Sequence, residues 1–372
     1  MTKMVVTPWE VSGKIDYDRL IKEFGTQKID NKLLRRIESH AGELHFMLTR
    51  RLFFSHRDVD WLLDKYDKGE KFYLYTGRGP SGHTHIGHLV PWIFTKWLQD
   101  KFNADLYFQM TDDEKFVFNP ELSLEETNKM SYENALDVIA LGFDPEKTFI
   151  FSDIDYAKTL YREALKVSKK LTFSTAKAVF GFENSSNVGQ IFFTSVQSVP
   201  AFLPSVKAGK NIPCLIPYAI DQDAHFRVCR DILPKLGFYK PAAIHTRFLP
   251  GLKGPESKMS ASIKDSVIFT TDSAKDAKKK IMSAFSGGAA SLEEHRKKGG
   301  DPDVDVACQY LYFMFEEDDE KVKEIFEGYR SGSITSGDVK KMLVDKVTRF
   351  LENHQKKRER AKKKLDKFIL TD

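Results

Sequence analysis

Three histidines lie within six residues of one another, at His83, His85 and His88. Imidazoles at this spacing can bind a metal ion, or they can donate hydrogen bonds to phosphate oxygens. A zinc site would need further ligands at a recognisable spacing, and the other histidines, such as His225 and His245, supply no such set. The three cysteines form no CxxC pair. The pattern therefore favours phosphate binding, and we predict no metal ion held by the protein itself.

The histidines belong to the stretch TGRGPSGHTHIGH, which runs from Thr76 to His88. By themselves, glycines and a proline here would indicate only a tight loop. However, the stretch joins a predicted strand to a predicted helix, and in a parallel sheet backbone N–H groups and the helix dipole favour a polyphosphate at this junction. Gly77, Gly79 and Gly87 would allow close approach of the backbone to the ligand.

A second candidate element, GPESKMSAS, begins at Gly254 and ends at Ser262. It carries one lysine, Lys258, between small hydroxyl residues, and such a string is by itself typical of an exposed loop. Because it follows late strands of the same predicted sheet, it could close over a nucleotide bound at the first turn. Lys258 could then neutralise charge on a departing pyrophosphate, most strongly in the transition state.

Short β-rich runs alternate with helical stretches in the part of the chain that must position these residues. Helical spacing is clearest at 89–102 and 132–143. The alternation predicts an α/β fold of Rossmann type, a mostly parallel sheet with helices on both faces. The predicted strands are 71–77, 104–110, 147–153, 212–221, 241–248 and 266–272.

The domain organisation follows from where this alternation begins and ends. We expect an N-terminal helical extension over 1–64 and a catalytic domain over 65–270, with an insertion at about 154–200. Residues 271–372 lack strand signals and predict an all-helical domain. In its last long helix, Thr335 followed by Asp338 resembles a capping box.

Composition supports an ordinary globular protein rather than a general nucleic-acid binder. The 372 residues contain 58 Lys and Arg against 53 Asp and Glu, a formal charge of +5. No apolar run approaches the roughly 18 residues of a membrane span, and we expect a cytoplasmic protein with reduced cysteines. Residues 351–372 hold eight basic residues against four acids. This basic end predicts either an RNA contact or a solvated helix face.

Two strings identify a family resemblance. His85-Ile-Gly-His88 matches the HIGH signature of class I aminoacyl-tRNA synthetases, and Lys258-Met-Ser-Ala-Ser matches their KMSKS signature. Ala261 replaces the usual lysine, as suits the tryptophanyl branch. The strings TGRGPSG, QMTDDEK and AIDQD resemble tryptophanyl-tRNA synthetases of the eukaryotic and archaeal type, and the resemblance covers nearly the whole chain from about Thr7.

This resemblance implies an ATP-dependent tryptophan–tRNA ligase. Such an enzyme converts L-tryptophan and ATP, which carries Mg²⁺, to tryptophanyl-adenylate and pyrophosphate, then transfers tryptophan to the 3′ end of tRNA(Trp). The positions that match the family's catalytic residues are His85, Gly87, His88, Lys258 and Ser260. Those that match its ATP contacts also include Gly77, Arg78, Gly79, Lys115 and Met259.

Recognition of tryptophan can also be argued from its chemistry. Indole has one N–H donor and no acceptor, so a selective pocket should present a buried acceptor. Tyr75 and Gln109 end two predicted strands at the carboxyl edge of the sheet, and the family places its indole contacts there. The resemblance assigns the substrate ammonium to Glu114, Gln197 and Gln222.

The family further implies a homodimer and an anticodon-binding role for the helical domain. The nearest alternative is a tyrosyl-tRNA synthetase, which would need a partner for the substrate hydroxyl, usually with an aspartate nearby. A small nucleotidyltransferase could carry His-x-Gly-His, but it would not need a C-terminal helical domain. A non-catalytic RNA-binding relative is a third alternative, disfavoured by the intact His85, His88 and Lys258.

Overall fold

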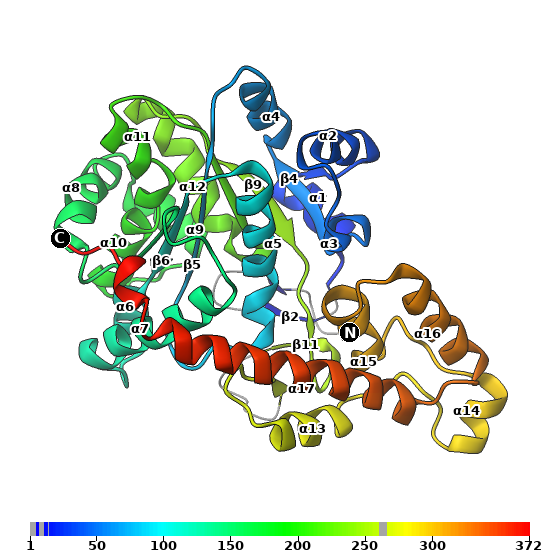
Figure 1. The fold of residues 1–372 in the computed structure, drawn as a ribbon. Helices are drawn as coiled ribbons and strands as arrows, with labels where there is room; N and C mark the ends of the chain where they lie inside the picture. The colour runs from blue at the N-terminus through cyan, green and yellow to red at the C-terminus, as the bar shows by residue number, and fades with distance from the viewer. Residues whose placement is uncertain (1–4, 7–10, 14, 260–265) are drawn as a thin grey trace.

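The computed structural model describes residues 5–6, 11–13, 15–259 and 266–372. Its main feature is a seven-stranded sheet with helices on both faces (Figure 1). The strands from β9 to β7 are mutually parallel, and β3 and β4 add an antiparallel edge. The predicted fold class is therefore confirmed. In spatial order the strands are β3 (Gln27–Lys28), β4 (Phe53–Arg57), β9 (Ala242–Thr246), β8 (Cys214–Ala219), β5 (Tyr73–Arg78), β6 (Leu106–Met110) and β7 (Thr148–Ser152).

The order of the parallel strands reverses beside β5. From β5 the chain adds β6 and then β7 on one side, and it later adds β8 and then β9 on the other. Connections leaving the carboxyl ends of β5 and β8 therefore turn to opposite faces of the sheet. A crevice opens at such a switch point, and in open α/β sheets it is where ligands bind.

Each face of the sheet is covered by its own group of helices and its own hydrophobic core. On the first face are α2 (Asn31–Ala41), α3 (Phe46–Thr49), α4 (Val59–Asp67), α5 (Ile86–Phe102) and α7 (Leu124–Ala140). On the second face are α8 (Ala157–Ser168), α9 (Phe173–Phe180), α10 (Val188–Val196), α11 (Leu203–Ala208) and α12 (Asp223–Ile232).

The remaining elements before residue 260 are short. The 3₁₀ turns are η1 (Val199–Ala201), η2 (Ile220–Gln222) and η3 (Leu233–Leu236). The others are α1 (Tyr17–Phe24), α6 (Asp112–Phe118) and two small hairpins, β1 (Val5–Val6) with β2 (Val11–Ser12) and β10 (Pro250–Gly251) with β11 (Gly254–Lys258).

The N-terminal region differs from the helical extension expected over 1–64. It contains helices, but β4 joins the main sheet through an antiparallel ladder with β9, in which His56 lies opposite Ile244. Phe53, Phe54, Ser55 and His56 are all buried. Helical periodicity on both sides of this short strand concealed it, because its pairing depends on a partner almost 200 residues away.

The expected insertion at 154–200 is helical, comprising α8, α9 and α10. These helices belong to the crossover from β7, at the edge of the sheet, to β8 beside β5. Their apolar side chains pack with those of α12 in the second core, among them Leu160, Phe180 and Phe193. The segment thus forms one wall of the second face.

The strand predicted at 266–272 is not formed. Phe269 makes only an isolated bridge, and its partner is His85 at the start of α5. The Ile86 N–H donates to the Ile268 carbonyl at 3.0 Å, and the Thr270 N–H donates to the Thr84 carbonyl at 2.9 Å. The β-prone residues here satisfy the backbone of the histidine turn instead of extending the sheet.

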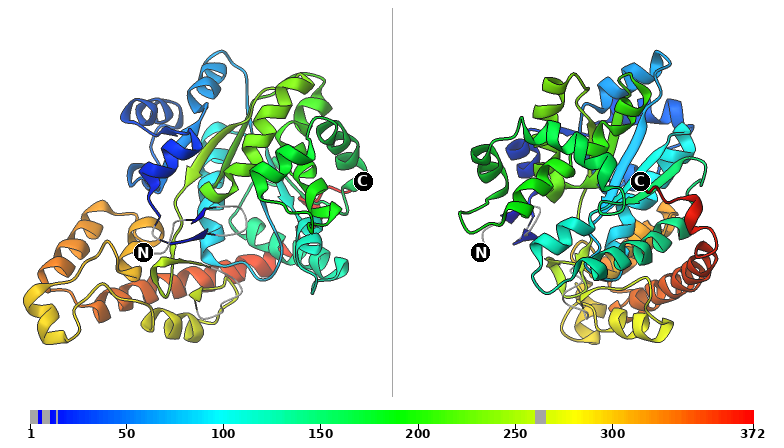
Figure 2. Two further views of the ribbon diagram at one scale, coloured as in Figure 1. Left: turned by 180° about the vertical axis from the view of Figure 1, so that it is seen from behind. Right: turned by 90° about the vertical axis from the view of Figure 1, so that its left-hand side faces the viewer.

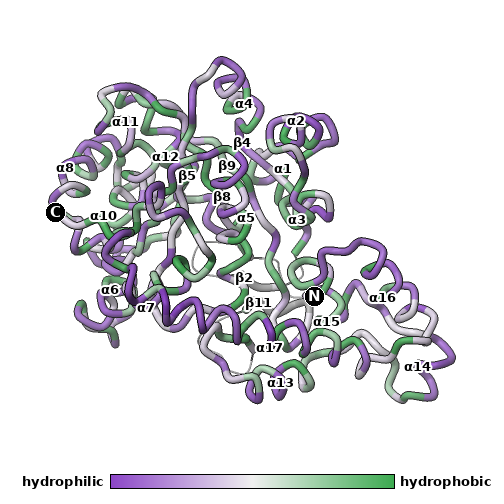
Figure 3. The backbone as a smooth tube through the Cα atoms, in the orientation of Figure 1, coloured by the Kyte–Doolittle hydropathy of each residue, from purple (hydrophilic) through white to green (hydrophobic). Residues whose placement is uncertain are grey.

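After residue 272 the elements that the structure describes are helices, as predicted, except that Ile369 forms an isolated parallel bridge with Ile150 of β7. Thr335 and Asp338 form the predicted capping box at the start of α17. Figures 1 and 2 show α17 running from the other C-terminal helices back along the part of the molecule that holds the sheet, and Figure 3 shows many hydrophilic residues along it. These elements are α13 (Ala274–Met282), α14 (Leu292–Lys298), α15 (Val306–Tyr310), the π-helical η5 (Leu311–Phe315), α16 (Asp319–Ser331), α17 (Ser336–Ala361) and η6 (Leu365–Lys367).

Within the described ranges, no helix combines the length and apolar character needed to cross a bilayer. The three cysteines are buried free thiols.

Candidate active site

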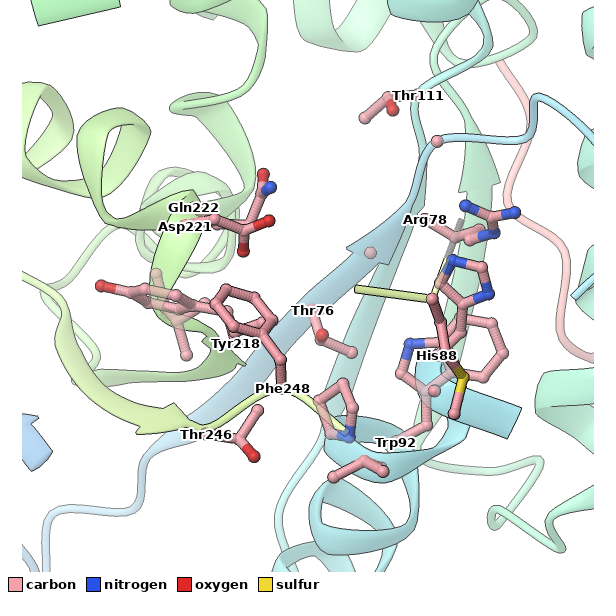
Figure 4. Close-up of a pocket in the computed structure, with 18 of the residues that line it drawn as sticks. Thr76, Arg78, His88, Trp92, Thr111, Tyr218, Asp221, Gln222, Thr246 and Phe248 are labelled. Atoms are coloured by element: carbon pink, nitrogen blue, oxygen red, sulfur yellow. The ribbon is translucent and has the colours of Figure 1, made fainter. Parts of the chain in front are cut away.

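A cavity of about 330 Å³ lies at the carboxyl edge of the sheet, where the strand order reverses. One wall consists of the turn after β5 and the start of α5. The other consists of the ends of β8 and β9 together with η2. Figure 4 shows Arg78, His88 and Trp92 on the first wall, facing Tyr218, Asp221 and Gln222 across the cavity, with Thr76 between them.

The first wall carries the two signature histidines. His85 is buried and stacks on His88, with ring centroids 3.5 Å apart. The His85 backbone N–H donates to Nδ1 of His88 at 3.2 Å. Because Nδ1 accepts this bond, the neutral His88 imidazole carries its proton on Nε2. The helix start thus presents an N–H donor, as a phosphate oxygen requires.

Three glycines permit the close packing of this turn. A Cβ on Gly77 would lie 2.7 Å from the backbone carbonyl oxygen of Gln109, and one on Gly79 would lie 2.1 Å from Cε of Lys115. A Cβ on Gly87 would lie 2.9 Å from the Met259 sulfur. Any larger residue would displace a neighbour at each position. These glycines were predicted as ATP contacts, and all three line the cavity.

Arg78 supplies a cation whose side chain is only partly satisfied. Its Nε donates to Asn134 of α7 at 3.1 Å. Its Nη2 is buried and has no hydrogen-bond partner among the described residues. Burial lowers the pKa of Arg78 to about 10, so it is still charged near neutral pH. A buried donor without a partner at the edge of a cavity is suited to an anionic ligand.

Glu114 and Lys115 place opposite charges beside Arg78. Glu114 accepts from the Lys115 ammonium at 2.7 Å and from the Thr111 hydroxyl at 2.6 Å. Burial alone would raise the pKa of Glu114, but these two partners outweigh it and hold the pKa below its ordinary value. Glu114 is therefore an anion at neutral pH, as binding of a substrate ammonium requires.

Tyr75, Gln109 and Gln197 form a hydrogen-bonded cluster at the floor of the cavity. The Tyr75 hydroxyl donates to Gln109 Oε1 at 2.5 Å, and Gln197 Nε2 donates to the Tyr75 hydroxyl at 2.6 Å. Tyr75 and Gln197 line the cavity, while Gln109 lies fully buried behind them. The structure thus brings together the two expected indole contacts and one expected ammonium contact.

Gln222, the third expected ammonium contact, stands on the opposite wall at the end of η2. The turn is fixed by the next residue, Asp223, which is buried. Arg57 of β4 donates to both Asp223 oxygens, at 3.0 and 2.9 Å, and the Tyr218 hydroxyl donates at 3.1 Å. The antiparallel strand that sequence analysis missed therefore supports this wall.

The second signature lies close to the first. Met259 is buried, lines the cavity and packs against Gly87. Lys258 ends β11, with its backbone paired to Pro250. The Lys258 side chain and Ser260 lie outside the described residues. Of the predicted KMSKS contacts, the structure therefore places Met259 alone at the cavity.

Sequence analysis missed several residues of the site. Asp153, which directly follows β7, accepts from Gln109 Nε2 through both carboxylate oxygens. Arg247 and Phe248 line the cavity at the end of β9. All three lie at the carboxyl-terminal ends of predicted strands, 147–153 and 241–248, and that position was the available signal.

In the part of the chain that the structure describes, no group of three or more His, Cys, Asp or Glu side chains is arranged to hold a metal ion.

Comparison with known proteins gives consistent matches. Residues 67–352 match the family model for class I tRNA synthetases (W and Y). Over 98% of its length the chain is 52% identical to a Saccharolobus solfataricus protein named tryptophan--tRNA ligase, 95% of which is covered.

Two solved structures extend this similarity to three dimensions. The tryptophanyl-tRNA synthetase of Plasmodium falciparum has a TM-score of 0.87 and 45% identity, covering 93% of this chain and 94% of that one. The tryptophanyl-tRNA synthetase of Encephalitozoon cuniculi, bound to tryptophan, has a TM-score of 0.88 and 40% identity, covering 97% and 99%. The similarity therefore includes both the sheet and the C-terminal helices.

Proposed function

Because this chain belongs to the class I tRNA synthetases for tryptophan and tyrosine, we propose that it is a tryptophan–tRNA ligase. It activates L-tryptophan with ATP to give tryptophanyl-adenylate and pyrophosphate, and it then transfers tryptophan to the 3′ end of tRNA(Trp). ATP enters with Mg²⁺ as part of the substrate.

In the first step, the tryptophan carboxylate attacks the α-phosphorus in line and expels pyrophosphate with its Mg²⁺. The protein contributes alignment and charge stabilisation. We assign the phosphates to Nε2–H of His88, to His85, and to the cations Arg78 and Lys115. Gly77, Gly79 and Gly87 leave room for the nucleotide, which Met259 contacts. Lys258 and Ser260 complete the contacts to the leaving pyrophosphate.

In the second step, a ribose hydroxyl at the tRNA 3′ end attacks the tryptophanyl carbonyl carbon and expels AMP. Throughout, the amino acid is held by its ammonium group, which Glu114, Gln197 and Gln222 bind. Glu114 supplies the charge, and the two glutamines supply amide oxygens.

The observation that carries the choice of tryptophan is the buried Tyr75–Gln109 pair beneath the cavity. A tyrosine-selective pocket would be expected to offer an aspartate to the substrate hydroxyl. The nearby aspartate, Asp153, is 4% exposed, and both of its oxygens accept from Gln109. It therefore faces Gln109 rather than the substrate, which favours an indole N–H over a phenol.

ATP–pyrophosphate exchange, measured with each of the twenty amino acids in turn, tests this proposal. We expect exchange with tryptophan alone, followed by charging of tRNA(Trp). Exchange with tyrosine instead would identify the tyrosyl alternative. A folded sample without exchange for any amino acid would favour a non-catalytic RNA-binding relative.

We also assign residues 271–372 to anticodon binding, and we expect a cytoplasmic homodimer.

A dimer is supported by exposed apolar side chains on α8, α9 and α10, where Tyr161 is 56%, Leu165 45%, Phe173 46% and Val188 81% exposed. Sedimentation velocity, which measures the oligomeric state, tests the expected dimer. Val188→Asp should give a monomer, whereas Leu292→Asp, at a 64% exposed position on α14, should not. A monomeric wild type would refute the proposed dimer.

A further inference from the structure

The side-chain amide of Gln109 has two chemically opposite ends, and its orientation decides what the floor of the cavity can recognise. An amide oxygen accepts a hydrogen bond, whereas an amide NH₂ donates two. Gln109 is fully buried on β6, so its orientation is fixed by protein neighbours rather than by water.

Asp153 provides that constraint. It follows β7, the strand paired in parallel with β6, and its backbone N–H donates to the Met110 carbonyl at 3.0 Å. Gln109 Nε2 lies 2.8 and 2.9 Å from the two Asp153 oxygens. A rotated amide would place its oxygen against a carboxyl group and lose this bond. The side-chain amide oxygen of Gln109, Oε1, is thereby directed toward Tyr75 and Gln197. It lies 2.5 Å from the Tyr75 hydroxyl and 3.2 Å from Gln197 Nε2.

Asp153 is itself supported by Asp113, to which it is hydrogen-bonded. Burial, followed by their mutual repulsion, raises the pKa of Asp153, and burial also raises that of Asp113. Two carboxyl groups in hydrogen-bond contact share one proton. Asp113 is anchored in turn, because its Oδ1 accepts the Glu114 N–H at 2.7 Å. The Asp113–Asp153 pair thus joins the ammonium-binding helix α6 to the indole end of the site.

We propose that Asp153 is a positioning residue for substrate specificity: it holds the Gln109 amide oxygen toward Tyr75 and Gln197, which line the floor of the cavity, so that the site selects a substrate ring bearing an N–H donor. The proposal rests on the proposed function, because it concerns the ring of the amino acid that the enzyme activates. Asp153 itself does not touch the substrate, and it acts through Gln109.

The test compares tryptophan with 3-benzothienyl-L-alanine, in which sulfur replaces the indole N–H in a ring of similar size. For each variant, kcat/KM in ATP–pyrophosphate exchange is measured with both amino acids and their ratio is taken. The ratio is internal to each protein sample, so partial loss of folded protein cancels.

Three variants separate hydrogen bonding from charge. Asp153→Asn keeps an oxygen that accepts from Gln109 and an NH₂ that donates to Asp113, so its ratio should stay within about twofold of wild type. Asp153→Leu removes both bonds and frees the Gln109 amide to rotate, so its ratio should fall by about tenfold. Asp153→Ser, too short to reach Gln109, should behave like Asp153→Leu and serves if the leucine variant does not fold.

An unchanged ratio in the leucine or serine variant would overturn the proposal, and so would an equal fall in Asp153→Asn. Wild type without tryptophan-dependent exchange would instead refute the proposed function, a separate outcome that is visible before any variant is made.

Discussion

His354 of α17 lies 2.9 Å from Asp137 of α7, measured from Nε2 to Oδ1, and each side chain is only 2% exposed. Arg358, one turn further along α17, also pairs with Asp137 and with Glu133. Burial alone would raise the pKa of Asp137, but His354 and Arg358 outweigh it and hold the pKa below its ordinary value. Because Asn134 on the same helix binds Arg78, α17 is tied to the active-site wall through α7.

Asp137→Asn should strongly destabilise the protein. The substitution leaves Arg358, which is 6% exposed, without its buried counter-charge. Breaking a buried pair in this way typically lowers the free energy of unfolding by about 3–5 kcal/mol. Urea denaturation at pH 7 measures this loss in the free energy of unfolding. The control is Glu359→Gln, which removes an exposed ion pair with Lys362 and should cost under about 1 kcal/mol. Equal effects of the two substitutions would show that the buried link is not important.

Gly87→Ala should reduce activity while leaving the fold largely intact. The new Cβ would lie 2.9 Å from Met259 Sδ and 3.1 Å from His85 Nδ1, so one of these groups must move. A displacement of this size in an aligned site costs about 10- to 100-fold in exchange rate. In Gly82→Ala, by contrast, the Cβ meets nothing within 4 Å, and exchange should remain at the wild-type rate. The prediction is wrong if both variants keep full activity.

His245 should contribute to acid sensitivity. It is fully buried between Ser55 and Tyr218, and burial lowers its pKa to about 3. From about pH 6.5 downward the unfolded chain binds a proton on this residue that the folded protein does not. The free energy of unfolding therefore falls with pH, by at most about 1.4 kcal/mol per pH unit from this residue.

Urea denaturation of His245→Gln between pH 7 and 4 measures this contribution. The variant should show a shallower decline in stability than wild type, whatever its stability at pH 7. Ser55→Ala removes the 2.8 Å hydrogen bond to His245 but keeps the titrating ring, so its decline should resemble that of wild type. If the free energy of unfolding of His245→Gln fell with pH as steeply as that of wild type, His245 would not contribute to acid sensitivity.

The exposed lysines near the end of α17 should contribute to tRNA binding. Arg358 is buried in ion pairs and does not belong to this surface, whereas Lys356, Lys357 and Lys363 are exposed. Replacing these three with alanine should weaken tRNA binding and reduce the slope of log K against log salt by about 1 for each phosphate that the protein no longer neutralises. Exchange without tRNA should not change.

Lys297→Ala with Lys298→Ala provides a comparison on α14, where both side chains are 72% exposed and paired with glutamates. This double variant should affect tRNA binding less. Unchanged tRNA binding in the α17 variant would mean that its basic run is a solvated helix face.

Much of the chemistry of this protein could be predicted from short stretches of its sequence. The glycines around Arg78, the histidines three residues apart and the capping box at Thr335 act within one turn or one loop. Their spacing is enough to predict a tight turn or a helix start, although distant residues such as Ile268 and Met259 complete the packing of the histidine turn. The alternation of strands and helices likewise predicted the parallel sheet and its carboxyl edge, where Tyr75 and Gln109 were expected and are found.

Tertiary structure decided what surrounds those residues. Asp153 lies 44 residues from the glutamine it orients, β4 pairs with a strand almost 200 residues away, and Phe269 bridges to His85 instead of extending the sheet. Arg358, which belongs to a basic run in the sequence, is buried against α7. The register between strands and the burial of a charge depend on how the whole chain packs. Sequence therefore predicted many of the groups that line the candidate site, and the folded structure determined which groups hold them there.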